Sequence, residues 1–116
     1  MSVSRWQQPI INSSPLMEAK IDNFNAWLHC CDEQILKSDL EELLNKSGFS
    51  ILNFMEHAFE PQGYTAIWLL AESHFALHTF PEEKKSYIEI SSCNSDLFVN
   101  FIVAFNDYQK KYPLTN

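Results

Sequence analysis

The sequence predicts an α+β fold, a two-layer sandwich in which two helices cover one face of an antiparallel or mixed sheet of about five strands. Two observations favour this class. Apolar and β-prone residues form several short segments separated by turn residues, as strands do, whereas two other segments repeat apolar residues at helical spacing. The 116 residues, 46% of them hydrophobic, are enough for one compact domain with a core but hardly for two.

The chain is expected to begin with an irregular arm. Residues 1–20 contain two prolines and a polar run without periodicity, so we predict an N-terminal arm over 1–20 and a single domain over 21–116. The first strand is expected within residues 23–31, where apolar residues alternate with polar ones and Trp27 faces the opposite side. The element order expected from there is strand, helix, four strands, helix.

A short helix follows the first strand in this prediction. Ser38 and Glu41 have the spacing of a capping box, in which each side chain satisfies the other residue's backbone N–H. Leucines at 40, 43 and 44 form an apolar stripe, and Gly48 is expected to end the helix.

Four strands and a second helix complete the prediction. Residues 49–59 and 64–72 are expected to form a hairpin around the turn Glu60-Pro61-Gln62-Gly63. The continuous apolar run 66–71 favours a central strand buried on both faces. Shorter strands are expected at 74–80 and 86–92, and apolar residues at helical spacing predict a helix from Leu97 to about Lys111.

Charge and composition exclude several classes of partner. Eight basic and 15 acidic residues give a net charge of -7, which disfavours nucleic acids and anionic membranes. The uncharged run 61–71 is far shorter than the roughly 20 residues of a spanning helix. The three cysteines cannot all pair and no signal peptide is recognised, so we expect a cytoplasmic protein. The four histidines lack metal-ligand spacing, and we predict no metal.

The most informative stretch is Glu72-Ser73-His74, followed by His78-Thr79-Phe80-Pro81-Glu82 and then Cys93. Ser73 precedes His78 by five positions and Cys93 by twenty. This pattern resembles the prokaryotic S-adenosylmethionine decarboxylase proenzymes in residue type, order and spacing. The resemblance extends over about residues 23–105 and includes Cys31-Asp32 and the run from Phe59 to Thr65.

A decarboxylase needs an electron sink for the charge left when carbon dioxide departs, and no ordinary side chain supplies one. The resemblance implies a covalent pyruvoyl cofactor made from Ser73. Its hydroxyl would attack the carbonyl of Glu72 and cut the chain into fragments 1–72 and 73–116. The resemblance also implies that His78 and Thr65 assist processing, His78 as general base for the α-proton. Serine is more usual in the family at position 65.

The resemblance implies further roles in turnover. The substrate amine would form a Schiff base with the pyruvoyl group, and Cys93 would donate the proton that replaces the carboxylate. Glu82 would bind the ribose hydroxyls and Phe59 would stack on adenine. Because such sites lie between protomers, the expected assembly is a homodimer of cleaved αβ protomers, in which Phe59 can serve the neighbouring chain.

Residues 85–94 depart from the family pattern and leave alternatives open. The first hypothesis is decarboxylation of S-adenosylmethionine to the aminopropyl donor for spermidine synthesis. The second keeps the pyruvoyl chemistry but takes a basic amino acid, arginine or ornithine, as substrate. The third is a regulatory homologue that never cleaves, although retention of Ser73 and Cys93 argues against it. We interpret five other residues as structural: His29, Cys30, Cys31, His57 and Trp68.

Overall fold

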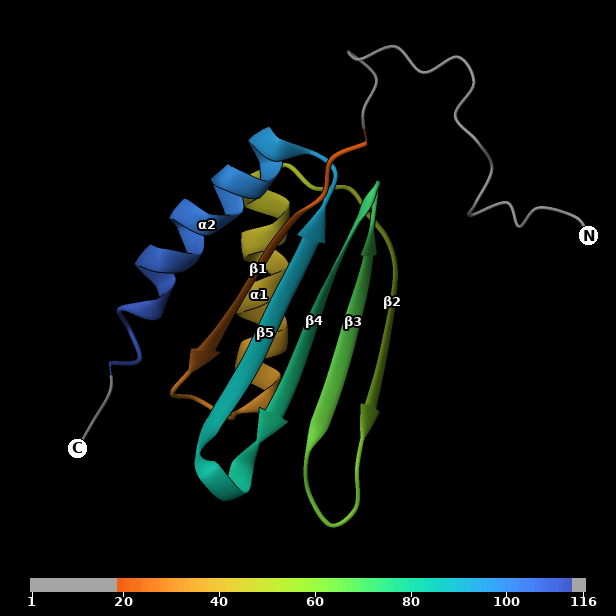
Figure 1. Cartoon of the computed structure of the whole chain (residues 1–116). Helices are drawn as coiled ribbons and strands as arrows, with labels where there is room; N and C mark the ends of the chain where they lie inside the picture. The colour runs from red at the N-terminus through yellow and green to blue at the C-terminus, as the bar shows by residue number, and fades with distance from the viewer. Residues whose placement is uncertain (1–18, 114–116) are drawn as a thin grey trace, which may run out of the picture.

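The computed structural model describes residues 19–113. Most of the predicted N-terminal arm, residues 1–18, lies outside the described residues, as do residues 114–116. The elements follow the predicted order of strand, helix, four strands and helix (Figure 1). They are β1 (Asp22–Leu28), α1 (Glu33–Ser47), β2 (Ile51–Ala58), β3 (Tyr64–Leu70), β4 (Ser73–Phe80), β5 (Lys85–Ser92) and α2 (Ser95–Gln109).

The five strands form one sheet in the order β1-β5-β4-β3-β2, and every neighbouring pair is antiparallel. Both helices pack on the same face of this sheet and contact each other (Figure 1). The predicted α+β class is therefore confirmed. Within residues 19–113, no helix is long and apolar enough to cross a membrane.

The core lies between the sheet and the two helices. Leu40, Leu43 and Leu44 of α1 are buried, as the predicted leucine stripe required. Phe75 of β4 links the layers, because its ring lies 5.4 Å from Trp68 of β3 and 5.3 Å from Phe101 of α2. Tilted and edge-to-face aromatic pairs of this kind add to the free energy gained by burying apolar area.

The helix α1 begins earlier than predicted. Its N-cap is Asp32, whose side chain accepts a hydrogen bond from the backbone N–H of Ile35 at 3.0 Å. The predicted capping box was therefore wrong: Ser38 lies inside the helix, and Glu41 accepts a hydrogen bond from Trp68 Nε1 instead. Gly48 ends the helix as predicted, with a left-handed φ of 104°.

The prediction that β3 is buried on both faces was also wrong. Ala66, Trp68 and Leu70 are buried against the helices, but Ile67 and Leu69 on the other face are 38% and 50% exposed. Both helices cover the same side, and within residues 19–113 no other element covers the second side of the sheet. We call this second side the open face. An apolar run alone does not distinguish a strand with one covered face from a strand with two.

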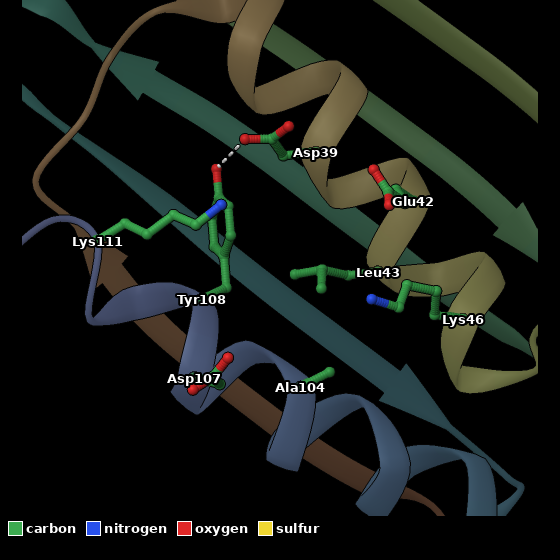
Figure 2. A pocket seen from close by; sticks show the side chains of 8 residues that line it. All are labelled: Asp39, Glu42, Leu43, Lys46, Ala104, Asp107, Tyr108 and Lys111. Atoms are coloured by element: carbon green, nitrogen blue, oxygen red, sulfur yellow. Dashed lines mark hydrogen bonds between the residues drawn. The ribbon is translucent and has the colours of Figure 1, made fainter.

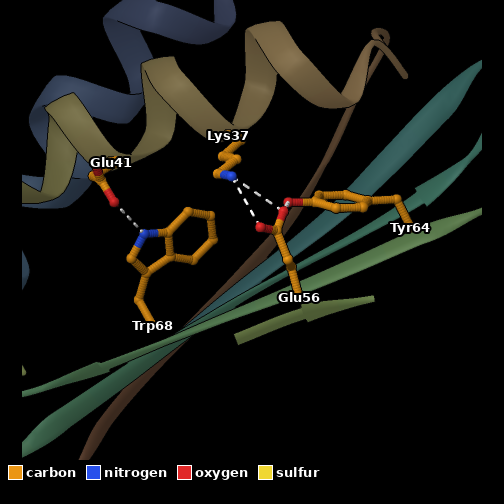
Figure 3. A network of polar contacts seen from close by, with 5 residues as sticks. All are labelled: Lys37, Glu41, Glu56, Tyr64 and Trp68. Carbon is orange, nitrogen blue, oxygen red and sulfur yellow. Dashed lines mark hydrogen bonds and ion pairs between the residues drawn. The ribbon is translucent and has the colours of Figure 1, made fainter. Parts of the chain in front are cut away.

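The edge strand β2 is tied to α1 by polar contacts (Figure 3). Lys37 Nζ lies 3.0 and 3.1 Å from the two carboxylate oxygens of Glu56, and the Tyr64 hydroxyl also donates to Glu56. The hydrogen bond from Tyr64, and then the contacts with Lys37, lower the pKa of the Glu56 carboxyl. We call these three residues the β2 clasp.

Candidate active site

The predicted site residues fall at opposite ends of the sheet. The β3–β4 turn and the β5–α2 connection share one end, and the β2–β3 and β4–β5 connections share the other (Figure 1). We call the first group, Glu72, Ser73 and Cys93, the serine end. The second group, the histidine end, consists of Phe59, Thr65, His78 and Glu82.

The peptide bond predicted to be cut lies in a tight turn at the serine end. Ala71 and Glu72 connect β3 to β4, and Leu70 pairs directly with Ser73. Glu72 has a left-handed φ of 59°, which costs a non-glycine residue about 1–2 kcal/mol. Its carbonyl oxygen accepts a hydrogen bond from the backbone N–H of Cys93 at 3.2 Å. Glu72 is thus held in a strained backbone conformation, and its carbonyl group is polarised by one hydrogen-bond donor.

Ser73 itself is nearly buried, at 8% exposure. Its hydroxyl donates a 2.7 Å hydrogen bond to Oγ of Ser92, its direct partner across the β4–β5 hairpin. Ser92 Oγ also accepts from the backbone N–H of Asn94, which caps α2. Sequence reasoning missed Ser92, although pairing the two predicted strands symmetrically about the turn at Glu82 and Glu83 would have placed it opposite Ser73.

A hollow of about 430 Å³ opens beside Ser73. This volume lies within the range of roughly 300–1,000 Å³ typical of small-molecule sites. Ile21, Leu52 and Leu69 provide an apolar part of its lining, and the predicted proton donor Cys93 also lines it. Cys93 is exposed and unpaired. The hollow is therefore accessible to a small ligand and includes all three residues of the serine end.

At the histidine end, Thr65 Oγ1 lies 2.9 Å from Nδ1 of His78, its partner across the β3–β4 pair. Strand register places both side chains in one row across the open face, between His57 on β2 and Tyr87 on β5. The His78 and Tyr87 rings stack at a centroid distance of 6.3 Å. The two residues expected to assist processing, Thr65 and His78, are therefore in contact with each other in the fold.

The other two predicted binding residues flank this row. Phe59 follows β2, is 50% exposed and contacts the His57 ring at 4.6 Å. Glu82 lies exposed in a short 3₁₀ helix, Pro81–Glu83, between β4 and β5. His57, interpreted above as structural, is thus a neighbour of the predicted adenine-stacking ring.

A single chain does not bring the two ends together. His78 is five residues along β4 from Ser73, a span of about 16 Å at 3.3 Å per residue. The odd interval also directs their side chains to opposite faces of the strand. Within one protomer, His78 therefore does not contact the Ser73 hydroxyl or its α-proton.

A second hollow, of about 220 Å³, lies between α1 and α2 and contains none of the predicted residues (Figure 2). Charged side chains from both helices surround it, and the Tyr108 hydroxyl donates to Asp39 across it. Burial, followed by hydrogen bonds with Tyr112 and Asp39, raises the pKa of Tyr108. Among residues 19–113, no three His, Cys, Asp or Glu side chains are grouped to hold a metal ion.

Comparison with known proteins identifies the family of this chain. The model of the family described as S-adenosylmethionine decarboxylase matches residues 26–109. The chain belongs to the S-adenosylmethionine decarboxylase family. The matched residues include both the serine end and the histidine end.

Individual relatives in the S-adenosylmethionine decarboxylase family match parts of the chain. The S-adenosylmethionine decarboxylase proenzyme of Parasynechococcus marenigrum (strain WH8102) is 39% identical over 62 residues, which are 53% of this chain and 48% of the relative. That of Brevibacillus brevis (strain 47 / JCM 6285 / NBRC 100599) is 28% identical over 85 residues, or 70% and 64% of the two chains. The chain thus spans about half the length of relatives such as the first.

A solved structure supports the same family fold. The crystal structure of the adenosylmethionine decarboxylase from Aquifex aeolicus VF5 superposes with a TM-score of 0.59 at 20% identity. The match covers 77% of this chain and 82% of that one. At this identity the likeness shows a shared fold.

Proposed function

We propose that this chain is the self-cleaving proenzyme of a pyruvoyl-dependent decarboxylase whose substrate is S-adenosylmethionine and whose product is the aminopropyl donor for spermidine synthesis. One observation carries the proposal: in a member of this family, Glu72 is strained immediately before a buried serine and its carbonyl accepts a hydrogen bond from Cys93 N–H. The proposed setting is the cytoplasm, where unpaired cysteines stay reduced.

Self-cleavage uses only this chain and water. Ser73 Oγ bonds to the Glu72 carbonyl carbon and loses its proton to a base, and the resulting oxyanion faces Cys93 N–H. The C–N bond then breaks as the nitrogen takes up a proton, which leaves an ester. Removal of the Ser73 α-proton breaks the Cβ–Oγ bond and releases the Glu72 carboxylate. Water hydrolyses the remaining dehydroalanine through its imine form, with loss of ammonia, to a pyruvoyl group.

The residues around position 73 fit a pyruvoyl group, because the hollow there is lined by polar groups and by an accessible thiol. The group supplies the electron sink for decarboxylation. Cys93 delivers the proton that replaces the carboxylate, since a thiol is largely protonated at neutral pH yet transfers its proton readily. Ile21, Leu52 and Leu69 give one side of the hollow an apolar lining.

Two chains complete each site in this proposal. The open faces of two protomers pack against each other, related by a two-fold axis that is perpendicular to the strands. This axis places the histidine end of one protomer over the serine end of its partner. Met55, Ile67 and Leu69, which are 64%, 38% and 50% exposed on the open face, supply an apolar surface for such packing. His78 and Thr65 then approach the partner's Ser73 through the hollow beside it, which Leu69 of the open face also lines, and Phe59 and Glu82 bind the partner's adenosyl group.

Intact-mass spectrometry of the purified protein tests this function. The 13.5 kDa chain should separate into fragments that meet between residues 72 and 73, and the Ser73→Ala variant should stay intact. Incubation with S-adenosylmethionine and a hydride reductant, which reduces the Schiff base to a stable amine, should add the mass of the trapped ligand to the 73–116 fragment. Arginine and ornithine are incubated with the protein in the same way, as the alternative substrates.

The outcomes separate the candidate functions. An adduct with arginine or ornithine alone would replace the substrate but keep the pyruvoyl chemistry. A wild-type chain that remains intact and forms no adduct would overturn the proposed function. Cleavage of Ser73→Ala would overturn the assigned cut site.

A further inference from the structure

We propose that Ser92 is a positioning residue for self-cleavage, and that it holds the attacking hydroxyl of Ser73 through a buried serine–serine hydrogen bond. The inference rests on the proposed function and adds to it a residue that the cleavage chemistry described above does not use. Its basis is the contact between Ser92 Oγ and Ser73 Oγ at 2.7 Å.

The surroundings of Ser92 favour this role over a solvated surface serine. Ser92 is 1% exposed, and Ser73 is 8% exposed, so water does not readily replace either partner. Among the hydrogen bonds of residues 19–113, Ser92 provides the one side-chain partner of Ser73 Oγ. A buried hydroxyl without a partner would cost about 1–3 kcal/mol, which holds the Ser73 side chain in this rotamer.

Ser92 is itself held by the start of α2. Its Oγ accepts from Asn94 N–H at 3.0 Å and lies 3.2 Å from Asn94 O, toward which its own hydrogen points. Asn94 is the N-cap of α2, and its side chain accepts from Leu97 N–H. The Ser73 hydroxyl is therefore connected through Ser92 to the rigid first turn of a 15-residue helix.

This connection fixes the attacking atom relative to the carbonyl that it attacks. Glu72 O is bound to Cys93 N–H, and Ser73 Oγ is bound to Ser92, so neighbouring residues of the β5–α2 connection hold both reacting groups. Ser92 is not the final proton acceptor, because an alcohol is too weak a base. It orients Ser73 Oγ by accepting its hydrogen bond, and it donates its own hydrogen bond to Asn94 O.

The rate of self-cleavage tests the proposal. Ser92→Ala should slow the appearance of the two fragments by about tenfold to a hundredfold, the loss expected for one oriented hydrogen bond. Ser92→Thr retains the hydroxyl and should cleave within a few-fold of wild type. Urea unfolding of each variant in a Ser73→Ala background measures the change in stability separately.

Ser86→Ala is the matched control. Ser86 lies on the same face of β5, is also fully buried, and donates a 2.7 Å hydrogen bond to the Cys30 carbonyl, far from Ser73. It should lose stability as Ser92→Ala does but cleave at the wild-type rate. If Ser92→Ala does not fold, Ser92→Cys replaces it as the test variant. A thiol has a similar shape but is a weak acceptor, so this variant should also cleave slowly.

Wild-type rates in folded Ser92→Ala or Ser92→Cys would overturn the role of Ser92, and so would equal slowing in Ser86→Ala. These results leave the proposed function intact, because they require a wild-type chain that cleaves. A wild-type chain that never cleaves contradicts the proposed function itself.

Discussion

Glu72 and Lys84 share a left-handed backbone conformation, with φ values of 59° and 55°, but only Glu72 adjoins the predicted cut. Each ends a tight connection between strands, where a side chain other than glycine is disfavoured. At Glu72 the strain is located in the residue whose carbonyl carbon changes from planar to tetrahedral on attack by Ser73. In the proposed mechanism, relief of that strain would therefore contribute to self-cleavage only at Glu72.

We expect Glu72→Gly to stabilise the uncleaved chain by about 1 kcal/mol, because glycine adopts a positive φ without steric cost. The same change should slow self-cleavage by several-fold, since less strain is released. Urea unfolding in a Ser73→Ala background and the time course of fragment formation measure the two effects.

Lys84→Gly is the control for this prediction, because it relieves the same backbone strain at the other end of β4. It should stabilise the chain similarly and leave the cleavage rate unchanged. Faster cleavage in Glu72→Gly, or equal slowing in both variants, would contradict a role of local strain in the reaction.

At the scale of elements, the β2 clasp adds polar contacts between β2 and the helix layer to the packing of Ile51 and Phe54 against the core. β2 is an edge strand, most of its residues are exposed, and it pairs only with β3. Lys37, Glu56 and Tyr64 join α1, β2 and β3 at one point. Because Phe59 directly follows β2, the clasp also supports the predicted adenine-stacking ring.

Glu56→Gln should destabilise the folded chain at pH 7, because the amide interacts more weakly with Lys37 and Tyr64. The folded state lowers the pKa of Glu56 below its unfolded value, so its stabilisation is complete above the ordinary glutamate range, about pH 4.3. The stabilisation is lost as the pH falls through the lower, folded pKa. Urea midpoints of wild type and variant, both carrying Ser73→Ala, should therefore converge in acid.

Glu83→Gln is a suitable comparison, because Glu83 pairs with Lys85 at 3.3 Å but lies in an exposed connection. Its effect at pH 7 should be smaller, as exposed ion pairs stabilise weakly. A Glu56→Gln difference that stays constant between neutral and acid pH would show that the clasp acts by packing rather than by charge.

At the scale of the whole molecule, one chain contains all the residues of the proposed site but separates them along the sheet. Ser73 and His78 are about 16 Å apart along β4 and face opposite sides. The open face, with its apolar side chains, offers the surface through which a second copy can supply the missing end.

Mixed dimers test this arrangement directly. Alone, Ser73→Ala cannot cleave and His78→Ala should cleave slowly, because it lacks the assisting imidazole. When the two variants are co-expressed with different tags, the His78→Ala chain should regain cleavage, since its intact Ser73 meets the partner's His78. Fragment analysis by tag measures this rescue. Failure of rescue in a demonstrated mixed dimer would contradict assistance between protomers.

A substitution on the open face provides the control for rescue. Ile67→Glu introduces a charge at the centre of the proposed contact, without touching either end of the sheet. It should produce monomers by size-exclusion chromatography and abolish rescue. Rescue that persists in monomeric Ile67→Glu chains would contradict an interface through the open face.

Much of this architecture was predictable from local pattern. Gly48 ends α1, the turn around Gly63 joins β2 to β3, and the helical spacing after Cys93 matches α2, because each signal depends on residues close in sequence. The start of α1 was missed because Ser38 and Glu41 have the spacing of a capping box, six residues after the N-cap that the structure shows at Asp32. Burial of β3 was overestimated because helix placement is a non-local property.

The sequence by itself determined the family, the order of the elements and the residues expected to react, because those depend on residue type and spacing along the chain. Only the tertiary structure decided what those residues meet. Strand register put Ser92 against Ser73 and Thr65 against His78, and the β5–α2 connection aimed Cys93 N–H at Glu72 O. Packing of both helices on one side left the other face open. These contacts join residues far apart in sequence, and their geometry follows from pairing and packing rather than from local propensity.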